Sequence, residues 1–242
     1  MEWKCSCKTT NEENLAKCTN CGRAKPKYFG IKIHFAPNEE FDNKKLSIWN
    51  LKVALKFLEI ARERLDKLDQ SKQEHAHHEK VPENVVSFWA GLKRRISQDC
   101  ENCFAMIDEA EKLDASPGFE NEDGIIVNSI SIRSDCHYLL GSLFFTVNNF
   151  EEAVNNFQKS FDLDPNQFSI YKLALSTINL PVEGKSLFSS KKTDQAIENK
   201  KQQEINLLKL TIKFSPFSDL GLLSAQILKE NYNYLITIAD LK

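Results

Sequence analysis

Four cysteines near the start of the chain have the residue type and the spacing of metal ligands. Cys5 and Cys7 form one close pair, and after a gap of ten residues Cys18 and Cys21 form a second. Four thiolates in two close pairs can converge on one tetrahedral Zn²⁺ at about 2.3 Å. Because sulfur fills all four positions, no position is left for water or a substrate, so we expect one structural Zn²⁺ per chain.

The segment that carries these cysteines is too short to fold by burying apolar surface alone. We place the zinc module at residues 1–27, and a unit of this size cannot offset the entropy of ordering its own chain. A structural zinc ion contributes about 10 to 16 kcal/mol to the folding of such units. We therefore expect the module to fold only with its metal.

The same segment resembles the Ran-binding-protein type zinc finger. That family places a Trp before the first Cys pair, an Asn between the two pairs, and Gly and Lys-Pro after the second. Beyond the cysteines, the residues that carry the resemblance are Trp3, Asn11, Gly22, Lys25 and Pro26. A single residue separates Cys5 from Cys7, where the family usually has more, so a generic small zinc ribbon stays open as the alternative.

The variable positions of the finger bear on what it contacts. Ubiquitin-binding members of the family resemble one another in a Thr-Phe pair after the second Cys, where this chain has Lys8 and Thr9. RNA-binding members carry an aromatic residue and arginines after the Asn, whereas Glu12 and Glu13 follow it here and would repel phosphate. Residues 1–34 nevertheless hold seven basic and three acidic side chains, so RNA binding by the finger stays open as an alternative.

Composition excludes several classes of protein. The 242 residues are 41% hydrophobic and 27% charged with a formal net charge of −2, as in ordinary globular proteins. No basic segment followed by an apolar run begins the chain, and its most apolar stretch, residues 138–147, is far shorter than the roughly 20 residues that span a bilayer. Three cysteines outside the metal pattern suit a reducing compartment. We expect a cytoplasmic protein without a membrane segment, with the nucleus as the alternative.

Apolar residues recur at steps of three and four from residue 44 onward, which predicts α-helices. Residues 28–43 are expected to form an extended connector to this region. One long helix is expected over 44–69 and a second over 83–113, with a polar linker between them. A Pro- and Gly-containing loop is expected at 115–128.

Two further groups of metal-ligating residue types lie in this region. His75, His77 and His78 occur in the polar linker without a neighbouring carboxylate or thiol, so we expect a flexible loop there and no metal. Cys100 and Cys103 could form half of a metal site on the second helix. No second pair remains for them once the finger has its four ligands, so we expect both in the core.

Residues 134–167 hold a regular set of small, apolar and helix-ending residues: Leu140, Gly141, Phe144, Ala153, Phe157 and Pro165. At these positions the segment resembles a tetratricopeptide repeat, which is a pair of antiparallel helices of about 34 residues. In such a unit the small residues, here Gly141 and Ala153, let the two helices approach closely, and the aromatic residues fill the space between them. A single repeat leaves an apolar face exposed, so neighbouring units are required.

The neighbouring units are more degenerate. An earlier unit would place Gly91, Cys103, Ile107 and Ala110 at repeat positions, although Arg94 stands at an aromatic place. After the repeat, and around an insertion near residues 181–192, helices are expected over 168–180, 193–214, 217–229 and 232–241. The fold class that we predict is mostly α: a small N-terminal zinc finger followed, over residues 44–242, by a tetratricopeptide-like α-solenoid or helical bundle of about eight helices.

No constellation of residues typical of an enzyme is present. The chain has no Gly-rich phosphate loop, no Ser-His-Asp or Cys-His arrangement with a credible partner, and no paired carboxylates in an apolar setting. We therefore expect a protein without catalytic activity or a small-molecule substrate. The favoured function is an interaction adaptor that binds a partner protein through its helical repeats, with the finger as a second contact. The alternative is an accessory subunit of an RNA-containing complex.

The resemblance to the repeat family also implies which residues bind the partner. In that family the first helix of each unit lines the inner face at regular places, two of which hold Asp135 and Ser169 here. The residues that we expect to bind a partner are Tyr138, Ser142, Phe145, Lys172, Ser176 and Asn179. Two aromatic residues beside a lysine and an amide suit an apolar anchor flanked by an acidic or polar segment. Alternatively, neighbouring helices or a large partner subunit cover this face.

Overall fold

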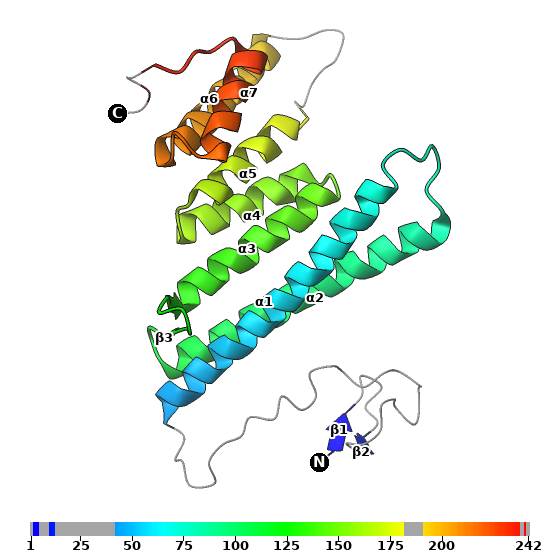
Figure 1. Ribbon diagram of the computed structural model, residues 1–242, viewed down its shortest axis with the longest axis vertical. Helices are drawn as coiled ribbons and strands as arrows, with labels where there is room; N and C mark the ends of the chain where they lie inside the picture. Colours follow the sequence, from blue (N-terminus) through cyan, green and yellow to red (C-terminus); the bar gives the residue numbers. More distant parts are fainter. Residues whose placement is uncertain (1, 5–9, 13–41, 182–190, 238–239, 241–242) are drawn as a thin grey trace. The chain divides into compact units, whose positions relative to one another are not determined.

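The structure, a computed structural model, describes residues 2–4, 10–12, 42–181, 191–237 and 240. The chain divides into two compact units, Met1–Phe41 and Asp42–Lys242. The second unit is mostly α-helical, as the apolar periodicity predicts, and seven helices lie in its described part. Figure 1 shows these helices in their order along the chain.

Two short strands are described in the first unit. β1 (Glu2–Lys4) and β2 (Thr10–Glu12) pair antiparallel, and their register places Trp3 opposite Asn11. The four cysteines of the predicted zinc finger lie outside the described residues, as does most of the expected connector.

α1 (Asn43–Glu74) and α2 (Glu83–Leu113) form a long helical hairpin, seen in Figure 1. The Asp42 carboxylate caps α1 by accepting the backbone N–H of Lys45 at 2.7 Å. α1 continues past the expected end at residue 69, because residues 70–74 are polar but are good helix formers. Buried side chains of α1, α2 and the following helix α3 (Ser129–Thr146) build one core. Its largest fully buried members are Leu51, Leu68, Ile96, Ile107, Ile132 and Leu143.

The expected loop at 115–128 is instead partly a β-hairpin. β3 (Gly118–Glu120) pairs antiparallel with β4 (Ile126–Asn128). The Asn121 side-chain oxygen organises the turn by accepting the backbone N–H groups of Asp123 and Ile125. Phe119 packs against the core, and the Lys52 ammonium lies 5.3 Å from its ring centroid. The hairpin therefore closes one side of the α1–α2–α3 core.

α3 and α4 (Phe150–Leu163) are the helix pair expected for residues 134–167. α3 begins before residue 134, because the side chains of Asn128 and Ser131 each bond the other residue's backbone N–H in a reciprocal capping box. A tight turn joins the two helices, and Asn148 adopts a left-handed φ of 59° in it. The predicted helix–turn–helix of this segment is confirmed.

The interior of this pair is packed as the repeat pattern predicts. A Cβ atom on Gly141 would lie 2.8 Å from two ring atoms of Phe157, so no side chain fits at this position. Ala153 and Phe157 are both fully buried. The close approach of α3 and α4 at Gly141 and Ala153 is therefore confirmed.

The earlier repeat unit that we inferred is wrong. Gly91, Cys103, Ile107 and Ala110 all lie on the single continuous helix α2, whereas a repeat needs a turn between its two helices. A Cβ on Gly91 would meet no atom within 4 Å, so Gly91 does not mark a close approach of helices. The helix pair that neighbours α3 and α4 is formed by α1 and α2.

α5 (Gln167–Asn179), α6 (Lys191–Phe214) and α7 (Asp219–Tyr232) follow, close to their expected positions. The last expected helix, over residues 232–241, does not form through residues 233–237. Asn233 ends α7 in a left-handed conformation, and the N–H of Tyr234 donates to the carbonyl of Leu228. Tyr234 and Ile236 then pack against the α6–α7 core as part of a non-helical segment.

Consecutive helices pack against one another from α1 through α7. The odd-numbered helices also contact each other in order, α1 with α3, α3 with α5 and α5 with α7. Comparable contacts between even-numbered helices are missing in the described part of the chain. This is the packing of a helical solenoid, with the odd-numbered helices sharing one side. None of the described helices has an apolar stretch long enough to cross a membrane.

Candidate protein-interaction surface

The structure brings together two of the expected partner-binding residues, Phe145 on α3 and Lys172 on α5. The Lys172 ammonium lies 5.1 Å from the centroid of the Phe145 ring, in the geometry of a cation–π contact. We call the side formed by Tyr138, Phe145, Lys172 and Asn179 the α3–α5 surface. No carboxylate among the described residues forms an ion pair with Lys172, so its charge faces solvent and the Phe145 ring.

The two aromatic residues of this surface are held in place by other rings. Phe145 packs edge-on against Phe150 with ring centroids 5.5 Å apart, and Tyr138 packs in the same way against Phe157, also at 5.5 Å. Burial raises the pKa of Tyr138, and the nearby Ser142 hydroxyl acts against that rise. Both rings are half-buried, so each keeps a fixed orientation and an open side.

Ser176 lies below this surface and does not form part of it. It is fully buried, and its hydroxyl donates to the carbonyl of Lys172 at 2.8 Å. Asn179 is exposed at the end of α5, where its amide donates to the carbonyl of Leu175. Of the residues expected on α5, Lys172 and Asn179 are therefore accessible to a partner in this structure.

A chain of buried serine hydroxyls links the three helices beneath the surface. The Ser134 hydroxyl on α3 lies 3.1 Å from that of Ser160 on α4, and the Ser160 hydroxyl lies 2.9 Å from that of Ser169 on α5. Ser134 also donates to the carbonyl of Ser160. All three side chains are buried, so this chain fixes α3, α4 and α5 relative to one another.

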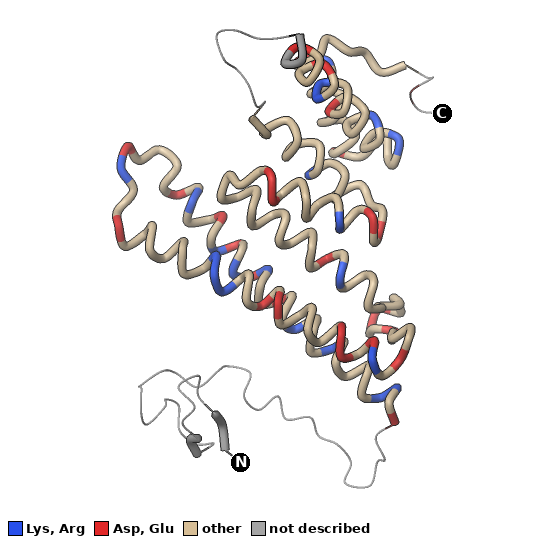
Figure 2. Tube along the Cα trace, turned by 180° about the vertical axis from the view of Figure 1, so that it is seen from behind, with Lys and Arg blue, Asp and Glu red and all other residues tan. Residues whose placement is uncertain are grey.

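The helices that carry the surface have few charges. Arg133, Asp135 and Lys172 are the charged residues of α3 and α5, whereas acidic and basic residues are frequent along α1 and α2. Figure 2 shows this contrast along the chain. Depletion of charge around aromatic side chains is typical of the central part of a protein–protein interface.

A hollow of about 340 Å³ opens next to Tyr138, between α1, α3 and the turn that joins α4 to α5. Its lining includes Arg62, Asp135, Asp164 and Phe168. Burial raises the pKa of Asp135. The charge of Arg62 acts against this rise, and the charge of Asp164 adds to it. Three of these residues were missed from sequence. Arg62 lies on a helix without a detectable repeat register, and Asp164 and Phe168 flank the places that the repeat family uses.

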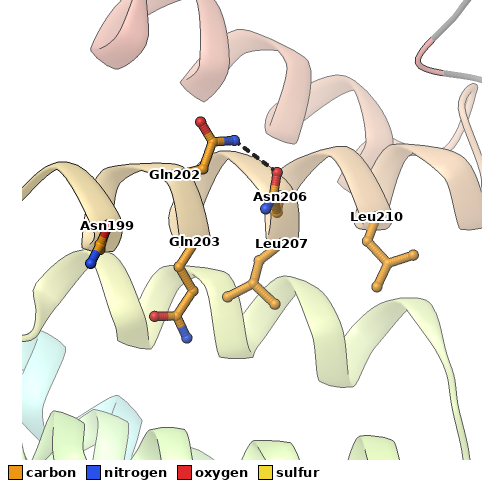
Figure 3. A pocket seen from close by; sticks show the side chains of 6 residues that line it. All are labelled: Asn199, Gln202, Gln203, Asn206, Leu207 and Leu210. Atoms are coloured by element: carbon orange, nitrogen blue, oxygen red, sulfur yellow. Dashed lines mark hydrogen bonds between the residues drawn. The ribbon is translucent and has the colours of Figure 1, made fainter.

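A second hollow, of about 420 Å³, lies along α6 and holds none of the expected partner-binding residues. Figure 3 shows the amide side chains that dominate it beside two leucines, with Gln202 donating to Asn206 at 3.0 Å. Its lining residues are Asn199, Gln202, Gln203, Asn206, Leu207 and Leu210. The hollow has no charged lining residue and no group that can titrate near neutral pH, so it offers neutral hydrogen-bonding groups and no acid–base chemistry.

Lys200, a basic residue on α6, has a structural role. Its ammonium donates to the carbonyls of Ile178 and Leu180, at the C-terminal end of α5, and forms an ion pair with Glu204 at 3.2 Å. These contacts occupy the charge that would otherwise attract phosphate.

The remaining thiols and imidazoles build no metal site in the described part of the chain. Cys100, Cys103 and Cys136 are free and fully buried in the α1–α2–α3 core, which confirms the expectation for the first two. Hydrogen bonding to the two neighbouring thiols and burial raise the pKa of Cys136, so it stays neutral. The rings of His75 and His78 pack against each other with their centroids 5.1 Å apart. No further metal-ligating side chain among the described residues joins them.

Comparison with known proteins gives similarity to one kind of protein. Over 77 residues, 31% of this chain, the sequence is 29% identical to anaphase-promoting complex subunit 7 from Homo sapiens and to the same subunit from Mus musculus. The aligned part is 14% of the length of each relative. No family model matches the chain, and no solved structure does. This similarity and the helical pairs are consistent with a tetratricopeptide-like helical domain.

Proposed function

We propose that this chain is a non-catalytic adaptor that binds a partner protein through the α3–α5 surface. The observation that carries the proposal is the contact between Phe145 and Lys172, which joins an aromatic anchor on one helix to a cation on another that has no carboxylate partner among the described residues. Aromatic residues, Phe among them, are enriched at protein interfaces, where a few well-packed residues carry most of the binding energy. The lysine beside them suits an acidic or polar segment next to the apolar anchor of the partner.

The comparisons support a protein as the partner. The similar relatives are, by name, subunits of a multiprotein complex. This chain aligns with a small part of them, so the proposal takes over only the general role of a repeat domain that holds protein partners. We place this role in the cytoplasm or the nucleus.

We propose that the first unit is a zinc finger that adds a second contact. The donor set of Cys5, Cys7, Cys18 and Cys21 fits structural Zn²⁺, which prefers thiolate sulfur in fourfold coordination. The pairing of β1 with β2 supports this, since the two strands flank the segment that contains Cys5 and Cys7. With zinc bound, the metal would supply the folding free energy of the unit, and Trp3 opposite Asn11 would fix its first hairpin.

Affinity capture with the full chain tests the adaptor proposal. We expect proteins captured by the wild type to be lost in the Phe145→Ala/Lys172→Ala variant and retained by a matched Phe217→Ala/Lys229→Ala variant. Phe217 is 91% exposed and Lys229 is exposed on α7, so the control removes the same groups from another surface. Circular dichroism must show equal helicity in the three proteins.

Nuclease and salt distinguish the adaptor from the RNA alternative. Capture through the α3–α5 surface should survive nuclease treatment and moderate salt. If capture vanishes with nuclease or falls steeply with salt while the Phe145→Ala/Lys172→Ala variant binds normally, contacts to phosphate carry the binding and the adaptor proposal fails.

A further inference from the structure

The hollow beside Tyr138 contains two carboxylates without partners. Asp135 on α3 and Asp164 at the end of α4 both line it, and neither carboxylate forms an ion pair or a hydrogen bond with another described residue. The charge of Asp164 adds to the rise in the pKa of Asp135. Arg62, on the α1 side, is the one cation among the described lining residues, so the hollow keeps an excess of negative charge.

An exposed aromatic ring also lines this hollow. Phe168 is 63% exposed, although it is a large apolar side chain on the first turn of α5. The half-buried Tyr138 contributes a second ring to the lining. A flat cation can stack on such rings while carboxylates accept its hydrogen bonds, and a guanidinium group does both.

The other polar groups of the hollow are already used. The Asn166 side chain accepts the N–H of Ser169 and donates to the carbonyl of Asp164. The Ser169 hydroxyl is buried in its bond to Ser160. Recognition in this hollow therefore depends on the two carboxylates and the two rings, and these favour a positive charge.

We propose that this hollow, lined by Asp135, Asp164, Phe168 and Tyr138, is a subsite for one arginine or lysine side chain of the partner protein. The proposal rests on the proposed function and specifies the chemistry of the partner: a basic residue beside the segment that meets Phe145. A volume of about 340 Å³ accommodates the end of one long side chain. Charge complementarity selects the basic residue, and Phe168 favours arginine over lysine.

The charge of Arg62 makes it possible to test whether the subsite binds a cation or an anion. Its charge opposes an incoming cation, so removing that charge should strengthen cation binding. A site for an anion would respond in the opposite way, since Arg62 is the cation among the described lining residues that could hold one. The sign of the Arg62→Gln effect therefore reports the charge of the ligand.

The test uses N-acetyl-arginine amide as the probe and follows the backbone amide signals of the ¹⁵N-labelled full chain by NMR. We expect saturable shifts at residues 135–138 and 164–169, and none with N-acetyl-citrulline amide, a neutral analogue of the same shape. Asp135→Asn/Asp164→Asn should weaken binding by about tenfold or more. Arg62→Gln should tighten it. Asp123→Asn/Asp162→Asn, with the same change in net charge outside the hollow, should leave the affinity unchanged.

Equal binding of the citrulline and arginine probes would overturn the subsite, as would unchanged affinity in the Asp135→Asn/Asp164→Asn variant. Loss of binding in Arg62→Gln, or shifts with N-acetyl-glutamate amide instead, would show that the hollow takes an anion. These outcomes are independent of partner capture. If the probe binds as expected but the Phe145→Ala/Lys172→Ala variant still captures the partner, the subsite stands and the proposed function fails; the reverse pattern removes the subsite alone.

Discussion

The ring of Phe157 occupies the space that a side chain on Gly141 would need. Three ring atoms lie within 2.9 Å of the position of a Cβ atom at Gly141, which is closer than non-bonded carbon atoms approach. The helix pair of α3 and α4 therefore depends on a residue without a side chain at this crossing.

We expect Gly141→Ala to destabilise the helical unit by about 1 to 3 kcal/mol, because the buried Phe157 ring must move. Gly91→Ala is the matched control, since a Cβ there meets no atom within 4 Å and the change should stabilise α2 by about 0.5 to 1 kcal/mol. Urea unfolding monitored by circular dichroism measures both. Two variants with the same small effect would contradict the close packing of α3 on α4.

A buried ion pair joins α1 to α2. Arg64 pairs with Asp99, whose side chain is 7% exposed. Burial raises the pKa of Asp99, and Arg64 acts against that rise. We expect Arg64→Met to cost about 3 kcal/mol or more, because it leaves a buried carboxylate without its partner. Arg64→Met/Asp99→Leu, which removes both charges, should recover most of this loss in the same unfolding measurement.

The Arg64→Met variant should also show a changed dependence on pH. Without Arg64 the pKa of Asp99 in the folded state rises further above its unfolded value. Over the pH range between these two values the folded state binds more protons than the unfolded state, so the stability of the variant should increase as pH falls. Unfolding at several pH values between 7 and 5 tests this. A variant whose deficit relative to the wild type stays constant over this range would count against a buried Asp99 charge.

His137 should make the helical unit less stable below neutral pH. It packs against Phe104 with ring centroids 4.8 Å apart, and its Nδ1 lies 3.2 Å from the side-chain oxygen of Asn156. Burial lowers the pKa of His137 below its ordinary value of 6.5, the Asn156 contact opposes this, and Lys159 and Arg133 add to the lowering. Just below pH 6.5 the unfolded state therefore binds more protons than the folded state. The contribution of His137 to the stability of the helical unit is complete above that pH and is lost as the pH falls.

We expect His137→Gln to flatten the pH dependence of the unfolding free energy between pH 7 and 5. His77→Gln is the control, since His77 is exposed in the turn after α1 and the change should leave the slope of the wild type. Equal slopes in the wild type and in both variants would show that burial of His137 does not contribute to the pH dependence of the unfolding free energy.

The zinc proposal predicts one Zn²⁺ per chain by elemental analysis of freshly reduced protein. Cys18→Ser should lose the metal, because three thiolates and a hydroxyl bind zinc far less tightly than four thiolates. The unfolding transition of the helices should remain, since Asp42–Lys242 is a separate compact unit with its own core. Reduced protein without zinc would remove the finger from the proposal.

Long helices could be predicted from the sequence because their buried residues repeat at steps of three and four. The β3–β4 hairpin could not, since strands of three residues are too short to show an alternating pattern. The end of α1 was placed too early because residues 70–74 carry no apolar signal, although they form helix readily. The last expected helix failed at Asn233, where a left-handed residue ends α7 in spite of apolar residues beyond it.

The candidate surface, too, could be predicted from the sequence only in part. The contact between Phe145 and Lys172 followed from the repeat register, which relates residues far apart in the chain. The burial of Ser176 did not follow, because the register gives a face of a helix and not the depth of a side chain. The hollow at Asp135 depends on how α1, with no repeat signal of its own, packs beside α3.

The hydroxyl chain through Ser134, Ser160 and Ser169 has a thermodynamic consequence for binding. Because these bonds hold α3, α4 and α5 at fixed positions before any partner arrives, association need not pay to order the backbone of the receptor. The heat capacity change of complex formation should then reflect only the apolar area covered, without the larger signature of folding coupled to binding. In a Ser160→Ala variant the three helices would be held less firmly before binding. Part of the free energy of association would then be used to order them.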